Sequence, residues 1–96
     1  MLLLSKFKVS GHSMEPQIIN NSAVLVSIIP YLFKSPKVND IVVFKDKDGK
    51  ILIKRIVKEE KDGYFVGGDN KSDSLDSRKL GNILKGQIIG KVIYKL

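Results

Sequence analysis

A serine on a glycine-initiated turn and a lysine in an apolar segment are the residues of this chain that could do chemistry together. Ser13 lies in Gly-His-Ser-Met-Glu-Pro, residues 11–16, and Lys54 lies in Ile-Lys-Arg-Ile-Val, residues 53–57. A serine hydroxyl becomes a nucleophile when a base removes its proton, and a lysine amine can be that base when loss of hydration lowers its pKa. The pair therefore predicts acyl transfer, with Ser13 as nucleophile and Lys54 as general base.

The turn around Ser13 suits a nucleophile. Gly11 permits a positive φ and close backbone approach, and Pro16 restricts how the chain leaves the turn. The backbone N–H of Ser13 would lie beside its own hydroxyl, where it could donate to an oxyanion. His12 is the only histidine, but a sequence neighbour normally points away from Ser13, so we do not expect it to be the base.

Alternation along a strand predicts the surroundings of Lys54. If residues 50–58 form a strand, Leu52, Lys54 and Ile56 share one face. An amine between two aliphatic side chains loses hydration, which favours its neutral form. The alternative is an edge-strand lysine whose amine extends into water.

The composition limits the chemistry. Ninety-six residues suit a single domain, residues 1–96, with one modest core. The absence of cysteine excludes disulfides, thiol catalysis and cysteine-ligated zinc. The acidic residues Asp69, Asp73 and Asp76 do not follow the spacing of a calcium-binding loop. We therefore expect no metal and no cofactor.

Strand patterns dominate the sequence, so we expect an all-β domain of five to seven short, mostly antiparallel strands. A polar loop is expected over residues 67–78. The expected strands cover residues 7–10, 23–29, 41–44, 50–59, 64–66 and 87–94.

A net charge of +7 raises the question of an acidic partner. No nucleic-acid recognition motif is present, so no nucleic acid is expected. An anionic membrane surface would suit the charge. The run Ile28–Phe33, beside Lys34 and Lys37, could make a peripheral membrane contact; the alternative is a core strand that leads into a loop. No apolar run is long enough to span a bilayer.

A third segment, residues 68–78, reads Gly-Asp-Asn-Lys-Ser-Asp-Ser-Leu-Asp-Ser-Arg. Together the three segments resemble type I signal peptidases, the serine–lysine family that removes signal peptides from secreted proteins. The likeness covers residues 9–16, 53–57 and 67–81, in the family's order. The compact size is also similar to the maturation proteases of nickel-type superoxide dismutase, which remove a short N-terminal extension.

The resemblance implies roles for residues in the third segment. Ser74 would orient the lysine amine, and Asp76 and Arg78 would form a salt bridge near the site. Asp69 and Asn70 would shape the start of the loop. The fold would be the one shared by signal peptidases and repressor autocleavage domains. A preprotein or leader-peptide substrate would bind as an extended strand, with small residues before the scissile bond.

The chain departs from the family pattern in three ways. Some members carry a serine two residues before the nucleophile that donates to the oxyanion hole; Gly11 stands there, and Ser10 is a weak substitute. The large β insertion of bigger bacterial enzymes is absent. The resemblance implies a membrane-associated enzyme with its site on the extracytoplasmic face, but the lack of an anchor leaves a soluble cytoplasmic form open.

Two alternatives remain at this point. The autocleaving domain of SOS-type and phage repressors shares a serine–lysine dyad but cuts its own chain upstream of the nucleophile, at a small residue followed by glycine. Here Ala23 is the only alanine, and it follows Ser13. The other alternative is a non-catalytic, basic binding module of the same fold.

Overall fold

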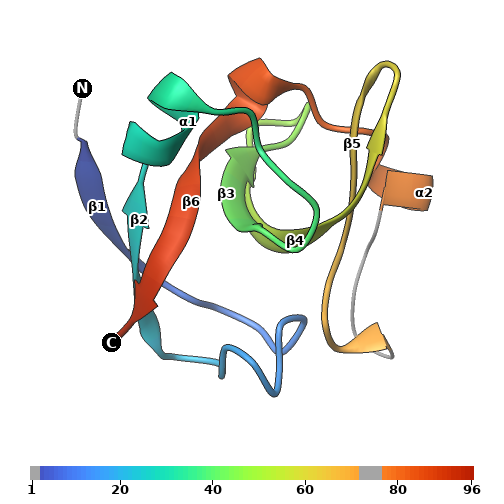
Figure 1. Ribbon diagram of the computed structural model, residues 1–96. Coiled ribbons are helices and arrows are strands. Elements are labelled where there is room, and N and C mark those ends of the chain that lie inside the picture. Colours follow the sequence, from blue (N-terminus) through green and yellow to red (C-terminus); the bar gives the residue numbers. More distant parts are fainter. Residues whose placement is uncertain (1–2, 72–76) are drawn as a thin grey trace.

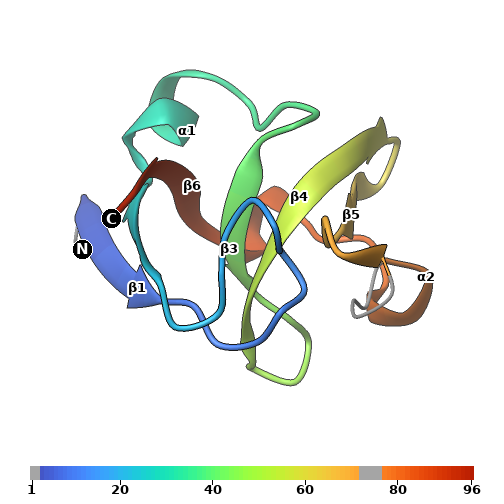
Figure 2. The same cartoon turned by 90° about the horizontal axis from the view of Figure 1, so that it is seen from below.

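The computed structural model describes residues 3–71 and 77–96. In this part of the chain, six strands form one sheet in the order β1-β2-β6-β3-β4-β5, and every neighbouring pair is antiparallel (Figures 1 and 2). The strands are β1 (Leu4–Lys8), β2 (Ala23–Ser27), β3 (Ile41–Lys45), β4 (Ile51–Glu60), β5 (Gly63–Gly67) and β6 (Ile88–Lys95). The expected all-β class is confirmed.

The described helices are short and lie outside the sheet. They are α1 (Ile29–Phe33), α2 (Ser77–Leu80) and a 3₁₀ turn, η2 (Lys85–Gln87). In Figure 1, α1 lies at one end of the sheet, and the loop that follows β1 lies at the other end. That loop carries the serine turn.

The sheet is buried on both faces near its centre, because β3 is apolar at successive positions. Val42 and Phe44 join the cluster on one face, while Val43 between them joins the cluster on the other. All three side chains are at most 2% exposed. Such two-sided burial explains the unbroken Ile-Val-Val-Phe run of this strand. The strand that carries Lys54, β4, pairs directly with this buried strand.

The expectation that Ile28–Phe33 is a core strand leading into a loop is wrong. The strand ends at Ser27, and α1 follows directly. Pro30 lies in the first turn of the helix, where its missing N–H has no intrahelical partner to lose. Tyr31 is buried, and its hydroxyl donates to Asp40 Oδ2 at 2.7 Å. This contact between segments explains why the apolar run turns instead of continuing as a strand.

Candidate functional site

Buried side chains fix the serine turn against the sheet. Met14 and Ile18 are each 1% exposed and pack in the cluster that contains Val43. Within the turn, the Glu15 N–H donates to His12 O at 3.1 Å, and the Ile18 N–H donates to Met14 O at 2.9 Å. Ser13 comes directly before Met14 and is half-buried.

Gly11 has the conformation that the sequence predicted for the start of the turn. Its φ is +102°, a region that residues with a side chain rarely adopt. Its N–H donates to Asn20 Oδ1 at 2.8 Å. The glycine therefore turns the chain from the end of β1 toward Ser13. Its backbone N–H is occupied by the bond to Asn20.

The burial of Lys54 follows the expected alternation along β4. Leu52 and Ile56 pack with one cluster and Ile53 packs with the other. Lys54 pairs with Val42 of β3 and is only 5% exposed. The alternative of an amine extended into water is therefore wrong, and the side chain is held inside the protein.

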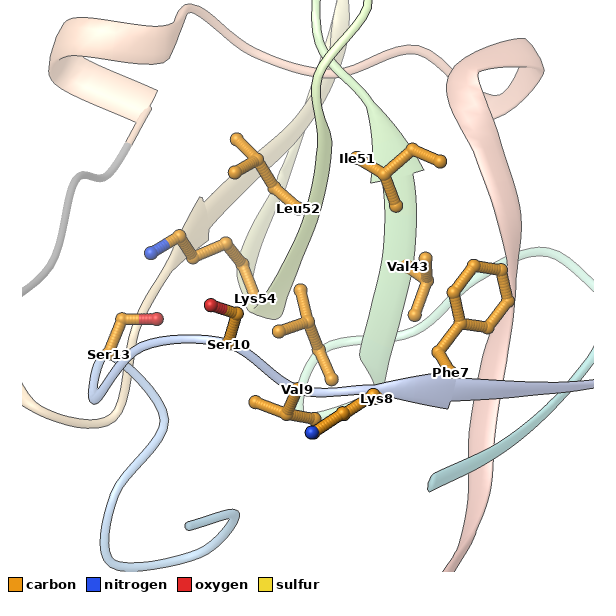
Figure 3. A pocket seen from close by; sticks show the side chains of 10 residues that line it. Phe7, Lys8, Val9, Ser10, Ser13, Val43, Ile51, Leu52 and Lys54 are labelled. Carbon is orange, nitrogen blue, oxygen red and sulfur yellow. The ribbon is translucent and has the colours of Figure 1, made fainter. Parts of the chain in front are cut away.

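Ser13 and Lys54 line one pocket of about 140 Å³. In Figure 3 the Ser13 hydroxyl and the Lys54 amine point into the same space, and the Ser10 hydroxyl points there as well. The rest of the lining is Phe7, Lys8, Val9, Val43, Ile51, Leu52 and Ile53. The structure thus brings together two residues that lie far apart in the sequence.

An ion pair anchors the segment that follows β5. Arg55 donates through Nε to Asp69 Oδ1 and through Nη2 to Asp69 Oδ2, each at 2.8 Å. A further bond runs from Arg55 Nη1 to Asn39 O at 2.8 Å. The Arg55 hydrogen bonds, with a smaller Coulombic contribution, lower the pKa of Asp69 below its usual value. This two-pronged geometry holds the Gly-Asp-Asn segment against the strand that carries Lys54.

Asn70 extends the connection to the nucleophile. Its backbone N–H donates to Ser13 O at 2.8 Å, and its side-chain Nδ2 donates to His12 O at 3.0 Å. The segment that Arg55 holds therefore also holds the serine turn. The sequence singled out Asp69 and Asn70 but missed Arg55 as the anchor, although the Lys-Arg dipeptide of residues 54–55 was the available signal.

Replacing Asp69 by asparagine should destabilise this connection. We expect the free energy of unfolding at pH 7 to fall by about 1–3 kcal/mol, because charge-assisted hydrogen bonds from Arg55 are lost. The folded-state pKa of Asp69 is lowered, so its stabilisation is present above the unfolded-state pKa and disappears as the pH falls through the folded-state value. Urea titrations from pH 7 to pH 2 check this: wild type and variant should converge in acid, and a constant gap would contradict the account.

His12 is engaged away from the proposed nucleophile. Its Nδ1 lies 2.9 Å from Glu15 Oε2, and its side chain is 55% exposed. Glu15 Oε2 also accepts from the Asn20 N–H at 3.2 Å. This backbone bond first, and His12 second, lower the pKa of Glu15. The His12–Glu15 pair therefore stabilises the loop. This agrees with the expectation that His12 is not the base.

Two residues that the resemblance assigned, Ser74 and Asp76, lie outside the described residues, as does Asp73. The lysine-orienting hydroxyl and the Asp76–Arg78 salt bridge therefore stay predictions. Arg78 is described and exposed. In the described ranges, no group of three or more His, Asp or Glu side chains is arranged to hold a metal ion.

A comparison with protein families shows the family to which the chain belongs. The family model described as "Signal peptidase, peptidase S26" matches residues 1–58 and 59–96. The chain belongs to this family of serine peptidases. The resemblance drawn from the three motifs is thereby confirmed.

Two curated relatives agree with the family assignment. The chain is 27% identical to Signal peptidase I V of Bacillus subtilis (strain 168), over 90% of its own length and 82% of that protein. It is 25% identical to Thylakoidal processing peptidase 1, chloroplastic, of Arabidopsis thaliana, over 86% of its own length. The chain spans 39% of the length of this second relative. Among the helices described here, none has the length and apolar character needed to cross a membrane.

Proposed function

We propose that the chain is a serine endopeptidase that uses a Ser13–Lys54 dyad. Its substrates would be preproteins, from which it removes signal peptides or short N-terminal leader extensions after small residues. The observation that carries this proposal is the shared pocket of a half-buried serine and a lysine that is 5% exposed. Burial favours the uncharged amine, which is the form that can accept a proton.

The chemistry would proceed by acyl transfer in two steps. Lys54 takes the proton of Ser13 as the hydroxyl oxygen attacks the peptide carbonyl carbon, which gives a tetrahedral oxyanion. The C–N bond then breaks, and the lysine passes the proton to the leaving amine. In the second step Lys54 deprotonates a water molecule, whose oxygen attacks the carbonyl carbon of the serine ester. The bond from this carbon to the Ser13 oxygen then breaks, the lysine returns the proton to that oxygen, and the new carboxyl end is released.

The pocket walls support an extended substrate. Residues 7–10 line one side and residues 51–54 line the other. An extended peptide between these two segments could hydrogen-bond to them as an added strand does. The names of both curated relatives, a signal peptidase and a processing peptidase, agree with a preprotein substrate.

Incubating the purified chain with a panel of signal-peptide and leader-peptide precursors tests the proposal. Sequencing the new N-termini should locate each cut directly after a small residue. A folded chain that leaves every precursor intact would contradict it.

Membership of the signal peptidase family favours this function over a self-cleaving repressor-type domain. The remaining alternative is a basic binding module without activity. Such a module would bind precursors and release no product, so the same incubation separates the two.

We further propose that the enzyme works at an anionic membrane surface, with its site on the extracytoplasmic face. The support comes from the α1 tip, which we define as Ile29, Leu32 and Phe33, exposed by 43%, 56% and 81%. Beside this apolar tip, a pocket of about 400 Å³ is also lined by Lys34, Lys37 and Lys91. Exposed apolar side chains beside cations suit the boundary between acyl chains and acidic headgroups.

Sedimentation with lipid vesicles tests the membrane contact. The wild type should bind vesicles that contain anionic lipid and lose binding at high salt. The double variant Leu32→Ser, Phe33→Ser should bind at least about 10-fold more weakly, because each apolar side chain contributes about 1.5–3 kcal/mol on burial. The matched control is Ile19→Ser. Ile19 is 61% exposed and lies in the loop that carries the serine turn. Equal binding of all three proteins would rule out the α1 tip.

A further inference from the structure

The proposed acyl transfer places negative charge on a carbonyl oxygen, and that charge needs hydrogen-bond donors. The Ser13 backbone N–H is one candidate, since within residues 3–71 and 77–96 it donates to no protein acceptor. Two donors commonly share an oxyanion, so the question is which group supplies the second.

Gly11 cannot supply it. The residue has no side chain, and its φ of +102° disfavours any replacement that has one. Its backbone N–H already donates to Asn20 Oδ1 at 2.8 Å. A donor from this position would require that bond to break.

Ser10 offers a hydroxyl in the right place. It lines the same pocket as Ser13 and Lys54, and Figure 3 shows its hydroxyl pointing toward that of Ser13. In the part of the chain that the structure describes, this hydroxyl has no protein hydrogen-bond partner. It is therefore available to a substrate.

The backbone before Ser10 is fixed, so its side chain has a defined direction. Val9 is 5% exposed and packs in the core. Its N–H donates to Ser22 O, and its carbonyl accepts from the Asn21 N–H, both at 2.8 Å. These bonds fix the backbone that carries Ser10, and the Ser10 hydroxyl points into the pocket (Figure 3).

We propose that the Ser10 hydroxyl donates the second hydrogen bond to the oxyanion of the tetrahedral intermediate. This inference rests on the proposed peptidase function and adds a catalytic residue to it. From the sequence alone, Ser10 was expected to be a weak substitute for a serine at position 11. The proposal instead gives Ser10 the donor role. The hydroxyl keeps its own proton throughout, and no bond to Ser10 forms or breaks.

The variant Ser10→Ala tests this role through steady-state kinetics on a cleaved precursor. We expect kcat to fall by about 10²–10³-fold, the usual effect of removing one oxyanion donor, with KM changed less than about twofold. Ser10→Thr keeps a hydroxyl and should recover most of the rate. Ser5→Ala, on strand β1 and outside the pocket lining, is the matched control and should behave like the wild type.

A peptide aldehyde gives a second readout, because its adduct with Ser13 carries the same oxygen. Its affinity should fall in Ser10→Ala by a factor similar to that in kcat. An active wild type with an equally active Ser10→Ala would overturn the inference and leave the proposed function standing. So would a shifted pH–rate profile with an unchanged maximal rate, since that result assigns Ser10 to positioning Lys54. A wild type that cleaves no precursor would overturn both.

Discussion

Replacing Lys54 by methionine is expected to abolish cleavage in a protein that remains folded. Methionine is similar in length but cannot accept a proton, so the rate should fall by at least about 10⁴-fold, as when a catalytic base is removed from other serine peptidases. Stability should change far less than activity. The side chain is 5% exposed, so an apolar replacement avoids the cost of taking an amine out of water, but it also removes an interaction that the lysine makes. We therefore expect the protein to stay folded and the free energy of unfolding to change by no more than about 1–3 kcal/mol.

The matched control for this variant is Lys58→Met. Lys58 lies on the same strand, and its side chain is 71% exposed. The control should cleave precursors at the wild-type rate, since it removes one lysine from β4 without touching the pocket. Cleavage by Lys54→Met at the rate of the control would exclude the lysine as base.

Replacing Ser13 by alanine should have an equally large effect. Removing the nucleophile is expected to lower kcat by about 10⁴–10⁶-fold, because the covalent route is lost. Precursor binding should persist, since one hydroxyl contributes little to the contact area of an extended peptide. Isothermal titration with an uncleaved precursor can measure the affinity of the variant for its substrate. The control is Ser35→Ala, at an exposed position outside the pocket that contains Ser13.

The combination of Ser13→Ala and Lys54→Met adds a stricter test of a dyad. Two residues that act as one unit give a double variant no slower than the slower single variant. Multiplying losses would indicate that the two side chains act independently, which the proposed mechanism does not allow.

Strand periodicity indicated the main feature of the site but left an alternative open. The alternation of Leu52, Lys54 and Ile56 with their neighbours made a buried amine one of two expectations, and the structure confirms it at 5% exposure. The apolar run over residues 41–44 was likewise predicted to be a strand, and β3 covers it. Both predictions succeeded because burial follows a local pattern of side chains, which the sequence displays directly.

Features that depend on register or on contacts between segments could not be predicted in this way. The Arg55–Asp69 pair forms because Arg55 lies opposite Gly67 in the β4–β5 pairing, two residues before Asp69. No local pattern encodes that register. The error at α1 has a similar cause: β-branched residues favoured a strand, whereas Pro30 and the bond from Tyr31 to Asp40 decide for a helix. The direction of the Ser10 side chain likewise depends on contacts between segments, the bonds that fix Val9.

Covalent labelling of Ser13 by a serine-reactive probe tests the dyad most directly. Mass spectrometry of the wild type should find the adduct on Ser13 alone, formed faster as the pH rises and the amine loses its proton. Lys54→Met should label far more slowly, while Lys58→Met should label like the wild type. Labelling of Ser13 at the same rate in all three proteins, or labelling of another serine, would contradict a nucleophile activated by Lys54.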